Sequence, residues 1–144
     1  MKPKFHLIRI VSKIHKFVYV ASRGRLTTRW KGLEFILLTT TGSVSGKERK
    51  VPLAAIRHED SYILIASFGG SPTPPGWLTN IVQNSSVRIA IGPTSVDANA
   101  TIIDPSHAEY PAMWAKAVAA YKGFDNYRRA TTRKIPVVLI TPTR

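Results

Sequence analysis

The sequence predicts a single α+β domain of mostly β structure: a small antiparallel β-barrel with helices on its periphery. Three observations lead to this fold class. The chain has 144 residues, the usual size of one domain. Apolar and β-branched runs of strand length recur along it, separated by turns rich in Gly, Pro, Asn and Asp. These runs do not alternate with helical segments, as they would in a parallel βαβ fold.

The N-terminal part, residues 1–31, is expected to be separate from the barrel, residues 32–144. From Phe5 to Ala21 the apolar residues fall within one arc of a helical wheel and the basic residues face the other way, which predicts an amphipathic basic helix. This helix could pack on the core, or it could lie in a membrane interface with its basic face toward lipid phosphates. Residues 22–31 are polar and basic and are interpreted as a linker.

The first half of the barrel region predicts three consecutive strands. An apolar and then β-branched run over residues 35–41 indicates a buried strand. Residues 49–58 alternate in polarity after a small-residue loop at 42–46, and residues 62–67 form another apolar run. The connections are short, so these strands are expected to form an antiparallel meander.

The second half begins with a loop over residues 68–76, which holds too many Gly and Pro residues for regular structure. Asp104 and Pro105 supply the N-cap and first-turn proline of a long helix that ends near Gly123. The expected elements are a helix over 77–84, strands over 87–91 and 94–103, a helix over 104–120 and a last strand over 135–141.

The charge predicts an anionic partner. Lys and Arg number 21 against 8 Asp and Glu, a net charge of +13 that is concentrated in residues 1–50 and 121–144. A generic solvated surface is the alternative. Non-specific nucleic-acid binding is disfavoured because aromatic residues are not interleaved with the basic ones, and no specific nucleic acid is expected. The absence of Cys excludes disulfides and Cys-ligated metals. We expect a cytoplasmic protein, held at the inner face of the membrane if the N-terminal helix is interfacial.

The sequence holds no recognisable set of catalytic side chains. The segment from Gly42 to Lys47 lacks the spacing and the following Ser or Thr of a phosphate-binding loop, and Val44 stands where a nucleophile elbow needs Ser. The four His residues share no metal-ligand spacing, so no metal site is expected. Loops of small residues with basic side chains beside them suit an organic cofactor that itself carries the reactive atom.

Four segments, in order, form a recognisable pattern. They are Thr39-Thr40-Thr41-Gly42-Ser43-Val44-Ser45-Gly46-Lys47-Glu48-Arg49-Lys50-Val51-Pro52-Leu53, Ala66-Ser67-Phe68-Gly69-Gly70 with Trp77 and Asn80, Tyr121-x-x-Phe124-x-x-Tyr127, and Ile135-Pro136-Val137-Val138. Together they resemble the deazaflavin-dependent nitroreductase family over residues 34–142. This chain departs from the family pattern at Ser43-Val44, where members usually have Arg-Lys, and at Phe68 and Phe124.

The resemblance implies a split β-barrel related to the FMN-binding, pyridoxamine 5'-phosphate oxidase-like fold. It implies an oxidoreductase that uses the reduced coenzyme F420, an 8-hydroxy-5-deazaflavin, to reduce a hydrophobic acceptor: a quinone, a nitro compound or an activated enone. Flavin mononucleotide as the cofactor, and a non-catalytic carrier of a lipid or an anionic cofactor, are the alternatives. The resemblance does not extend to the oligomeric state.

Residue roles follow from the resemblance by position. The implied cofactor-binding residues are Lys47, Arg49, Lys50, Pro52, Leu53, Ala66, Ser67, Gly69, Gly70, Trp77 and Asn80. Arg49 and Lys47 would contact the phosphate and glutamate tail of the coenzyme as charge-assisted donors. Tyr121 and Tyr127 are the implied catalytic residues, whose hydroxyls would orient or protonate the acceptor. The alternatives are a solvated strand position for Arg49, and plain core positions for the two tyrosines and Trp77.

Overall fold

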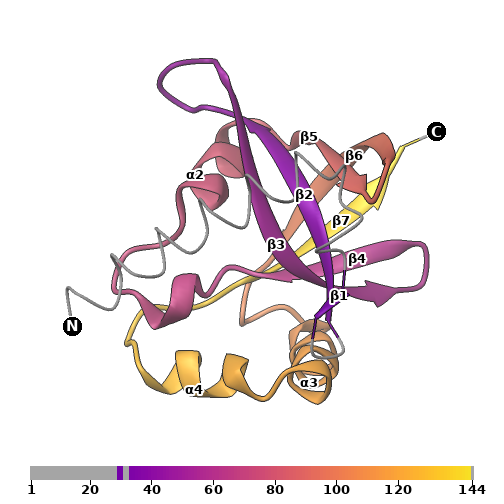
Figure 1. Cartoon of the computed structure of the whole chain (residues 1–144). Helices are drawn as coiled ribbons and strands as arrows, with labels where there is room; N and C mark the ends of the chain where they lie inside the picture. The colour runs from indigo at the N-terminus through magenta and orange to yellow at the C-terminus, as the bar shows by residue number, and fades with distance from the viewer. Residues whose placement is uncertain (1–28, 31–32, 144) are drawn as a thin grey trace.

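The computed structural model describes residues 29–30 and 33–143 (Figure 1). Its strands are β1 Arg29–Trp30, β2 Leu33–Thr41, β3 Glu48–His58, β4 Ser61–Ile65, β5 Ser86–Ile91, β6 Thr94–Ile103 and β7 Val137–Pro142. Its helices are the 3₁₀ turn η1 Phe68–Gly70, α2 Gly76–Gln83, α3 Tyr110–Ala120 and α4 Gly123–Arg129. The helix predicted over residues 5–21 lies outside the described residues.

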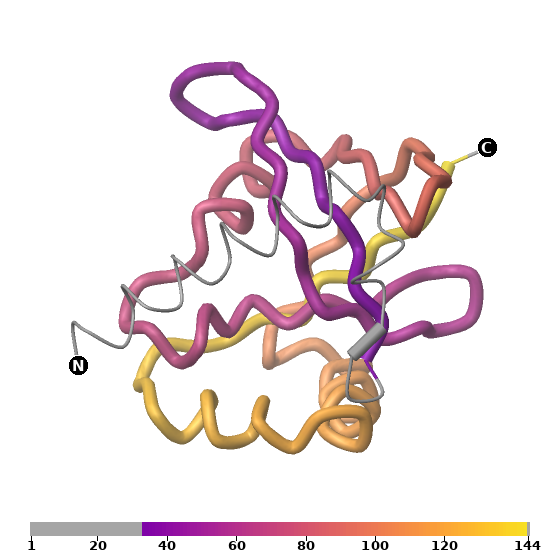
Figure 2. Tube along the Cα trace, in the orientation of Figure 1, coloured from indigo at the N-terminus to yellow at the C-terminus, as the bar shows by residue number. Residues whose placement is uncertain are grey.

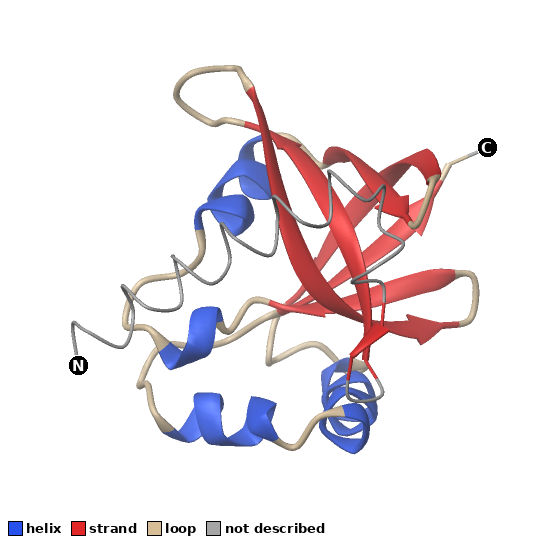
Figure 3. Ribbon diagram, in the orientation of Figure 1, coloured by secondary structure: helices blue, strands red, loops and turns tan. Residues whose placement is uncertain are grey.

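The strands form one antiparallel sheet that closes on itself (Figure 3). Hydrogen-bonded neighbours follow the order β1-β2-β3-β4-β7-β6-β5, and β2 also pairs with β5, from Leu37↔Ala90 to Thr39↔Arg88. In the described part of the chain, β2 to β7 therefore complete a six-stranded barrel, which confirms the predicted fold class. Closure pairs the outermost strands, so their backbone groups are not left as open edges.

The core has two layers, and β4 belongs to both. All five of its residues are buried. Tyr62 and Leu64 point into the barrel, whereas Ile63 and Ile65 pack with Trp114 and other residues beneath it. Figure 2 shows α3 and α4 lying along this outer side, where the chain turns back to β7. A strand covered on both faces appears in the sequence as a continuous apolar run, which explains why residues 62–67 were recognised.

The predicted start of the long helix at Asp104 is wrong. The Asp104 carboxylate instead accepts hydrogen bonds from the N–H (2.9 Å) and hydroxyl of Ser106, which holds a turn, and helix α3 begins at Tyr110. Two prolines, Pro105 and Pro111, are both compatible with a first helical turn. The local sequence therefore does not show which of the two prolines lies in the first turn of the helix. The hydroxyl of Tyr110 donates to the carbonyl of Ile135 at 2.6 Å, which ties the true helix start to the segment before β7.

Three further differences concern short elements. Helix α3 ends at Ala120, as predicted, but Gly123 then begins a further helix, α4, which the sequence did not predict. Trp114 Nε1 on α3 donates to Asp125 Oδ1 on α4 at 2.8 Å, and the Arg128 guanidinium lies 4.3 Å from the ring of Trp114. The loop over 68–76 contains the turn η1, and β1 lies within the segment expected to be a linker. No helix in the described ranges is long and apolar enough to cross a membrane.

Candidate functional site

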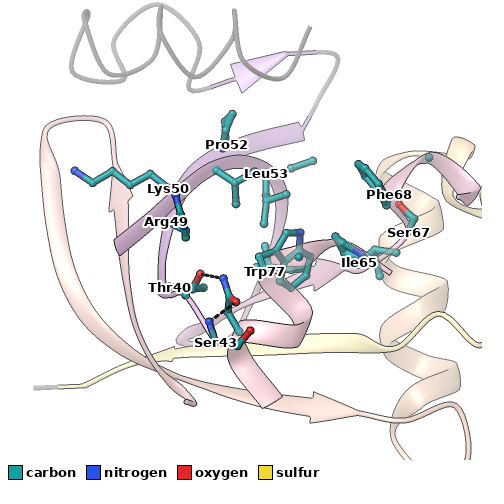
Figure 4. Close-up of a pocket in the computed structure, with 18 of the residues that line it drawn as sticks. Thr40, Ser43, Arg49, Lys50, Pro52, Leu53, Ile65, Ser67, Phe68 and Trp77 are labelled. Atoms are coloured by element: carbon teal, nitrogen blue, oxygen red, sulfur yellow. Dashed lines mark hydrogen bonds between the residues drawn. The ribbon is translucent and has the colours of Figure 1, made fainter. Parts of the chain in front are cut away.

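A cavity of about 820 Å³ opens between the β2–β3 hairpin, helix α2, the turn η1 and helix α4 (Figure 4). This volume is typical of a site for a cofactor or a small-molecule ligand. Nine of the predicted site residues line it: Arg49, Lys50, Pro52, Leu53, Ser67, Gly69, Trp77, Asn80 and Tyr127. Segments far apart in the sequence thus contribute to one cavity, as the predicted pattern requires.

Four predicted site residues lie outside the cavity lining. Lys47 is exposed on the hairpin, and Ala66 is fully buried just after β4. Gly70 packs against α4, where an added Cβ would lie 3.0 Å from the carbonyl oxygen of Tyr127. Tyr121 contacts the hydroxyl of Tyr127. These residues can support the lining but do not form it.

The cavity is polar at one end and apolar along the rest of its wall. Thr40, Ser43 and Arg49 lie at the hairpin end, where β2 and β3 separate. Most of the apolar lining comes from β2, β3, β4, η1, α2 and α4 and includes Phe35, Val51, Pro52, Leu53, Ala54, Leu64, Ile65, Phe68, Trp77 and Phe124, with Val44 and Pro75 from the adjoining loops. Such a cavity fits a ligand with a flat apolar body and an anionic tail.

Asn80 holds the polar end together. Its side chain is buried on α2, its Nδ2 donates to Thr40 Oγ1 at 3.0 Å, and its Oδ1 accepts the N–H of Ser43 at 3.0 Å (Figure 4). Ser45 Oγ in turn accepts the N–H of Lys47 at 3.2 Å and a hydrogen bond from Arg49 Nη2 at 3.3 Å. These bonds shape the hairpin loop without any ligand.

Replacing Asn80 with Ala is expected to destabilise the fold. The change leaves the N–H of Ser43 and the hydroxyl of Thr40 without their partner, and we expect a loss of about 1–3 kcal/mol in the free energy of unfolding. Denaturant unfolding followed by tryptophan fluorescence measures it. Gln83→Ala, on the exposed end of the same helix, is the control and should stay within about 0.5 kcal/mol of the unchanged chain. Equal stability of both variants would contradict this role for Asn80.

The aromatic set at the other end is built around a pair of tyrosines. The hydroxyls of Tyr121 and Tyr127 lie 3.2 Å apart, and Phe124 meets Tyr121 edge to face at 5.1 Å between ring centres. Burial, together with the hydrogen bond to Tyr121, raises the pKa of Tyr127 to about 12. The Tyr127 hydroxyl therefore keeps its proton throughout the neutral range. Only Tyr127 and Phe124 of this set line the cavity.

Two features of the site gave little sequence signal. Thr40 lies within a longer motif that gives it no role of its own, yet its hydroxyl is buried and bonded to Asn80. In the sequence Arg133 is simply one of the basic residues near the C-terminus, yet it donates to three carbonyls of the Ala66–Ser71 segment. Among the described residues no cluster of three or more His, Cys, Asp or Glu side chains could hold a metal ion.

The comparisons with known proteins agree on one family. The model of the F420H(2)-dependent quinone reductase family matches residues 11–142. The chain belongs to this family. An F420H(2)-dependent quinone reductase of Mycobacterium tuberculosis (strain ATCC 25618 / H37Rv) is 33% identical over 131 residues, which cover 90% of this chain and 88% of that protein. The expected family, the oxidoreductase class and the F420 cofactor are therefore confirmed.

Solved structures place the fold of this F420H(2)-dependent quinone reductase family member. An F420-H2 dependent reductase (FDR-A) superposes with a TM-score of 0.65 at 36% sequence identity, covering 74% of this chain and 92% of its own. A Listeria innocua protein named after pyridoxamine 5'-phosphate oxidase superposes with a TM-score of 0.53 at 9% identity, covering 91% and 94%, and shares the fold alone. The predicted split barrel is thereby confirmed.

Proposed function

We propose that the protein is an F420H2-dependent reductase of quinones, with the described cavity as its active site. The observation that carries this proposal is the polarity of the cavity, which is apolar along its strands and helices and cationic at the hairpin end. When bound, the reduced deazaflavin supplies the hydride. The residues of the protein bind and orient the coenzyme and the acceptor, exclude water from the cavity and control the position of a proton.

Arg49 and Lys50 are proposed to hold the anionic part of the coenzyme. Both are exposed at the mouth of the cavity, where a long polar tail can extend into solvent. The hydrogen bond from Arg49 Nη2 to Ser45 Oγ leaves its other guanidinium N–H groups to donate to phosphate or carboxylate oxygens. Ser43 and Val44 are uncharged. Arg49 and Lys50 therefore supply the positive charge of the cavity lining at this end.

The apolar wall is proposed to receive the ring system of the coenzyme and the acceptor together. Leu53 and Trp77 bound it on the barrel side, and Phe124 bounds it on the side of α4. Apolar walls exclude water from the reacting atoms and favour a hydrophobic acceptor over a small polar one. Quinones fit this description best. Nitro compounds and activated enones are proposed as secondary acceptors, because their oxygens also gain negative charge as hydride arrives.

Tyr127 is proposed to hold a proton at the acceptor oxygen. Tyr127 lines the cavity, and its hydroxyl, with a pKa raised to about 12, is fully protonated at neutral pH. A neutral donor directed at an oxygen that gains negative charge stabilises the transition state more than the ground state. Tyr121 supports it from behind through the 3.2 Å contact between the two hydroxyls.

A titration with both candidate cofactors tests the proposed function. We expect saturable binding of F420, seen as quenching of tryptophan fluorescence, and oxidation of F420H2 when a short-chain naphthoquinone is added. Flavin mononucleotide should bind more weakly. Preferential binding of flavin mononucleotide would contradict the coenzyme assignment. Binding of F420 without turnover on any quinone would favour a carrier over an enzyme.

Gly123→Ala is expected to lower kcat without removing any hydroxyl. A Cβ at this position would overlap the ring of Tyr121, so the ring must move and its contact with the hydroxyl of Tyr127 is lost. We expect a several-fold decrease in kcat with unchanged F420 affinity, since one hydrogen bond in the tyrosine pair is worth about 1 kcal/mol. Steady-state kinetics measure both. Lys122→Ala, an exposed neighbour, is the control. Unchanged kcat in Gly123→Ala would mean that the orientation of Tyr121 does not matter.

A further inference from the structure

Arg133 lies on the segment between α4 and β7 and contacts the loop that follows β4. Its Nε donates to the carbonyl of Ser71 at 2.9 Å, and its Nη2 donates to the carbonyls of Ala66 at 3.1 Å and Ser67 at 2.8 Å. One guanidinium thus joins both ends of the loop, from a position more than 60 residues further along the chain. We infer that Arg133 is a positioning residue that fixes the shape of the coenzyme-binding loop over residues 66–71.

The loop has a conformation that needs support from outside. Phe68, Gly69 and Gly70 have φ angles of 43°, 63° and 80°, three consecutive residues in the left-handed region. For a bulky residue such as Phe68 this region is strained, and such strain persists only where the surroundings enforce it. Within the loop, two short-range backbone bonds run from the N–H of Gly70 to the carbonyl of Ser67 and from the N–H of Ser71 to the carbonyl of Phe68. Arg133 adds three bonds from elsewhere in the fold, beside the one that the N–H of Ala66 donates to the carbonyl of Pro136 at 3.3 Å.

The guanidinium also sets the direction of two peptide groups. In a trans peptide the C=O and N–H bonds point in opposite directions, and the described residues contain no cis peptide. Because the carbonyls of Ala66 and Ser67 are turned toward Arg133, the following N–H groups, those of Ser67 and Phe68, point away from it. Ser67, Phe68 and Gly69 line the cavity, whereas Arg133 does not. Any effect of Arg133 on the coenzyme therefore acts through the loop.

The chemistry of the contact requires arginine. Burial lowers the pKa of Arg133, and its hydrogen bonds within the described part of the chain go to neutral carbonyls. A guanidinium keeps its charge under these conditions and presents donors in a fixed planar fork. A lysine has a single nitrogen and does not reach carbonyls at both ends of the loop with this geometry. Arg133→Lys therefore keeps the charge but loses the bridge.

Two measurements test the inference, of which the second rests on the proposed function. The first is amide hydrogen exchange without coenzyme in Arg133→Lys, Arg133→Ala and the control Lys134→Ala, which removes the same charge from the exposed neighbouring residue. We expect exchange over residues 66–71 to be about tenfold faster in both Arg133 variants and unchanged in the control. Exchange as slow as in the unchanged chain, or acceleration spread equally over β4 and β7, would overturn the inference.

The second measurement is steady-state kinetics with F420H2 and a naphthoquinone. In Arg133→Lys we expect the KM for F420H2 to rise about fivefold. The kcat at saturating coenzyme should stay within about twofold of the wild-type value, because bound coenzyme should restore the order of the loop in this variant. Millimolar guanidinium should partly restore the KM of Arg133→Ala, and methylammonium should not. An unchanged KM beside faster loop exchange would overturn the coenzyme-positioning role. If the unchanged chain binds no F420, the proposed function fails, and the exchange experiment still decides whether Arg133 holds the loop.

Discussion

Tyr127→Phe is expected to lower kcat about tenfold or more while leaving F420 affinity intact, since a buried hydrogen bond contributes on the order of 1 kcal/mol or more. Tyr127 lines the cavity beside Phe124, and phenylalanine keeps the ring that packs there. Only the donor is removed. An interaction made mainly in the transition state lowers kcat more than it raises KM.

Stopped-flow and steady-state measurements on several quinones check this result. Tyr121→Phe should have a similar effect, because it removes the hydroxyl that contacts Tyr127 at 3.2 Å. Tyr62→Phe, which lies in the barrel core away from the cavity lining, is the control. Full turnover in Tyr121→Phe, Tyr127→Phe and the double variant on every acceptor would show that both tyrosines are core aromatics and that the proton comes from solvent.

The raised pKa of Tyr127 adds a pH dependence to the same experiment. An ordinary tyrosine has lost its proton in half of the molecules near pH 10, whereas Tyr127, with its pKa raised to about 12, stays protonated there. Near pH 10, the kcat of the wild-type protein and that of Tyr127→Phe should therefore change with pH in the same way.

Arg49→Ala is expected to weaken F420 binding about tenfold or more, because a charge-assisted hydrogen bond to an anion contributes roughly 1.5–3 kcal/mol. The loss should be larger for coenzyme forms with longer glutamate tails, which place more carboxylates at the hairpin end of the cavity. Arg49 is exposed, so added salt should reduce the difference between the unchanged chain and the variant.

Fluorescence titration at low and moderate salt measures this affinity. Arg57→Ala is the matched control, since it removes the same charge from the same strand at an exposed position outside the cavity lining. An affinity of Arg49→Ala equal to that of Arg57→Ala would remove Arg49 from the proposed binding site. The proposal for Arg133 would then be judged on its own measurements.

Much of the site could be predicted because its residues belong to compact motifs. Arg49, Pro52 and Leu53 follow the hairpin loop directly, so one continuous segment brings them to the cavity. The family resemblance implies Tyr127 through the aromatic pattern that it forms with Tyr121 and Phe124. The motif did not show which of its residues support the fold and which remain available to bind the coenzyme. Asn80 was assigned to the cofactor, but both ends of its amide already bond to Thr40 and Ser43.

The sequence alone determined the strands of the barrel, because alternation and β-branched runs reflect which faces are buried, and burial dominates local choice. It also determined the family. Only the tertiary structure decided the closure of β2 on β5, the helix start at Tyr110 rather than Asp104, and the contact of Arg133 with the loop over residues 66–71. These features depend on pairing between distant segments and on competition between equally good local signals, and no local pattern encodes which distant partner will satisfy a polar group.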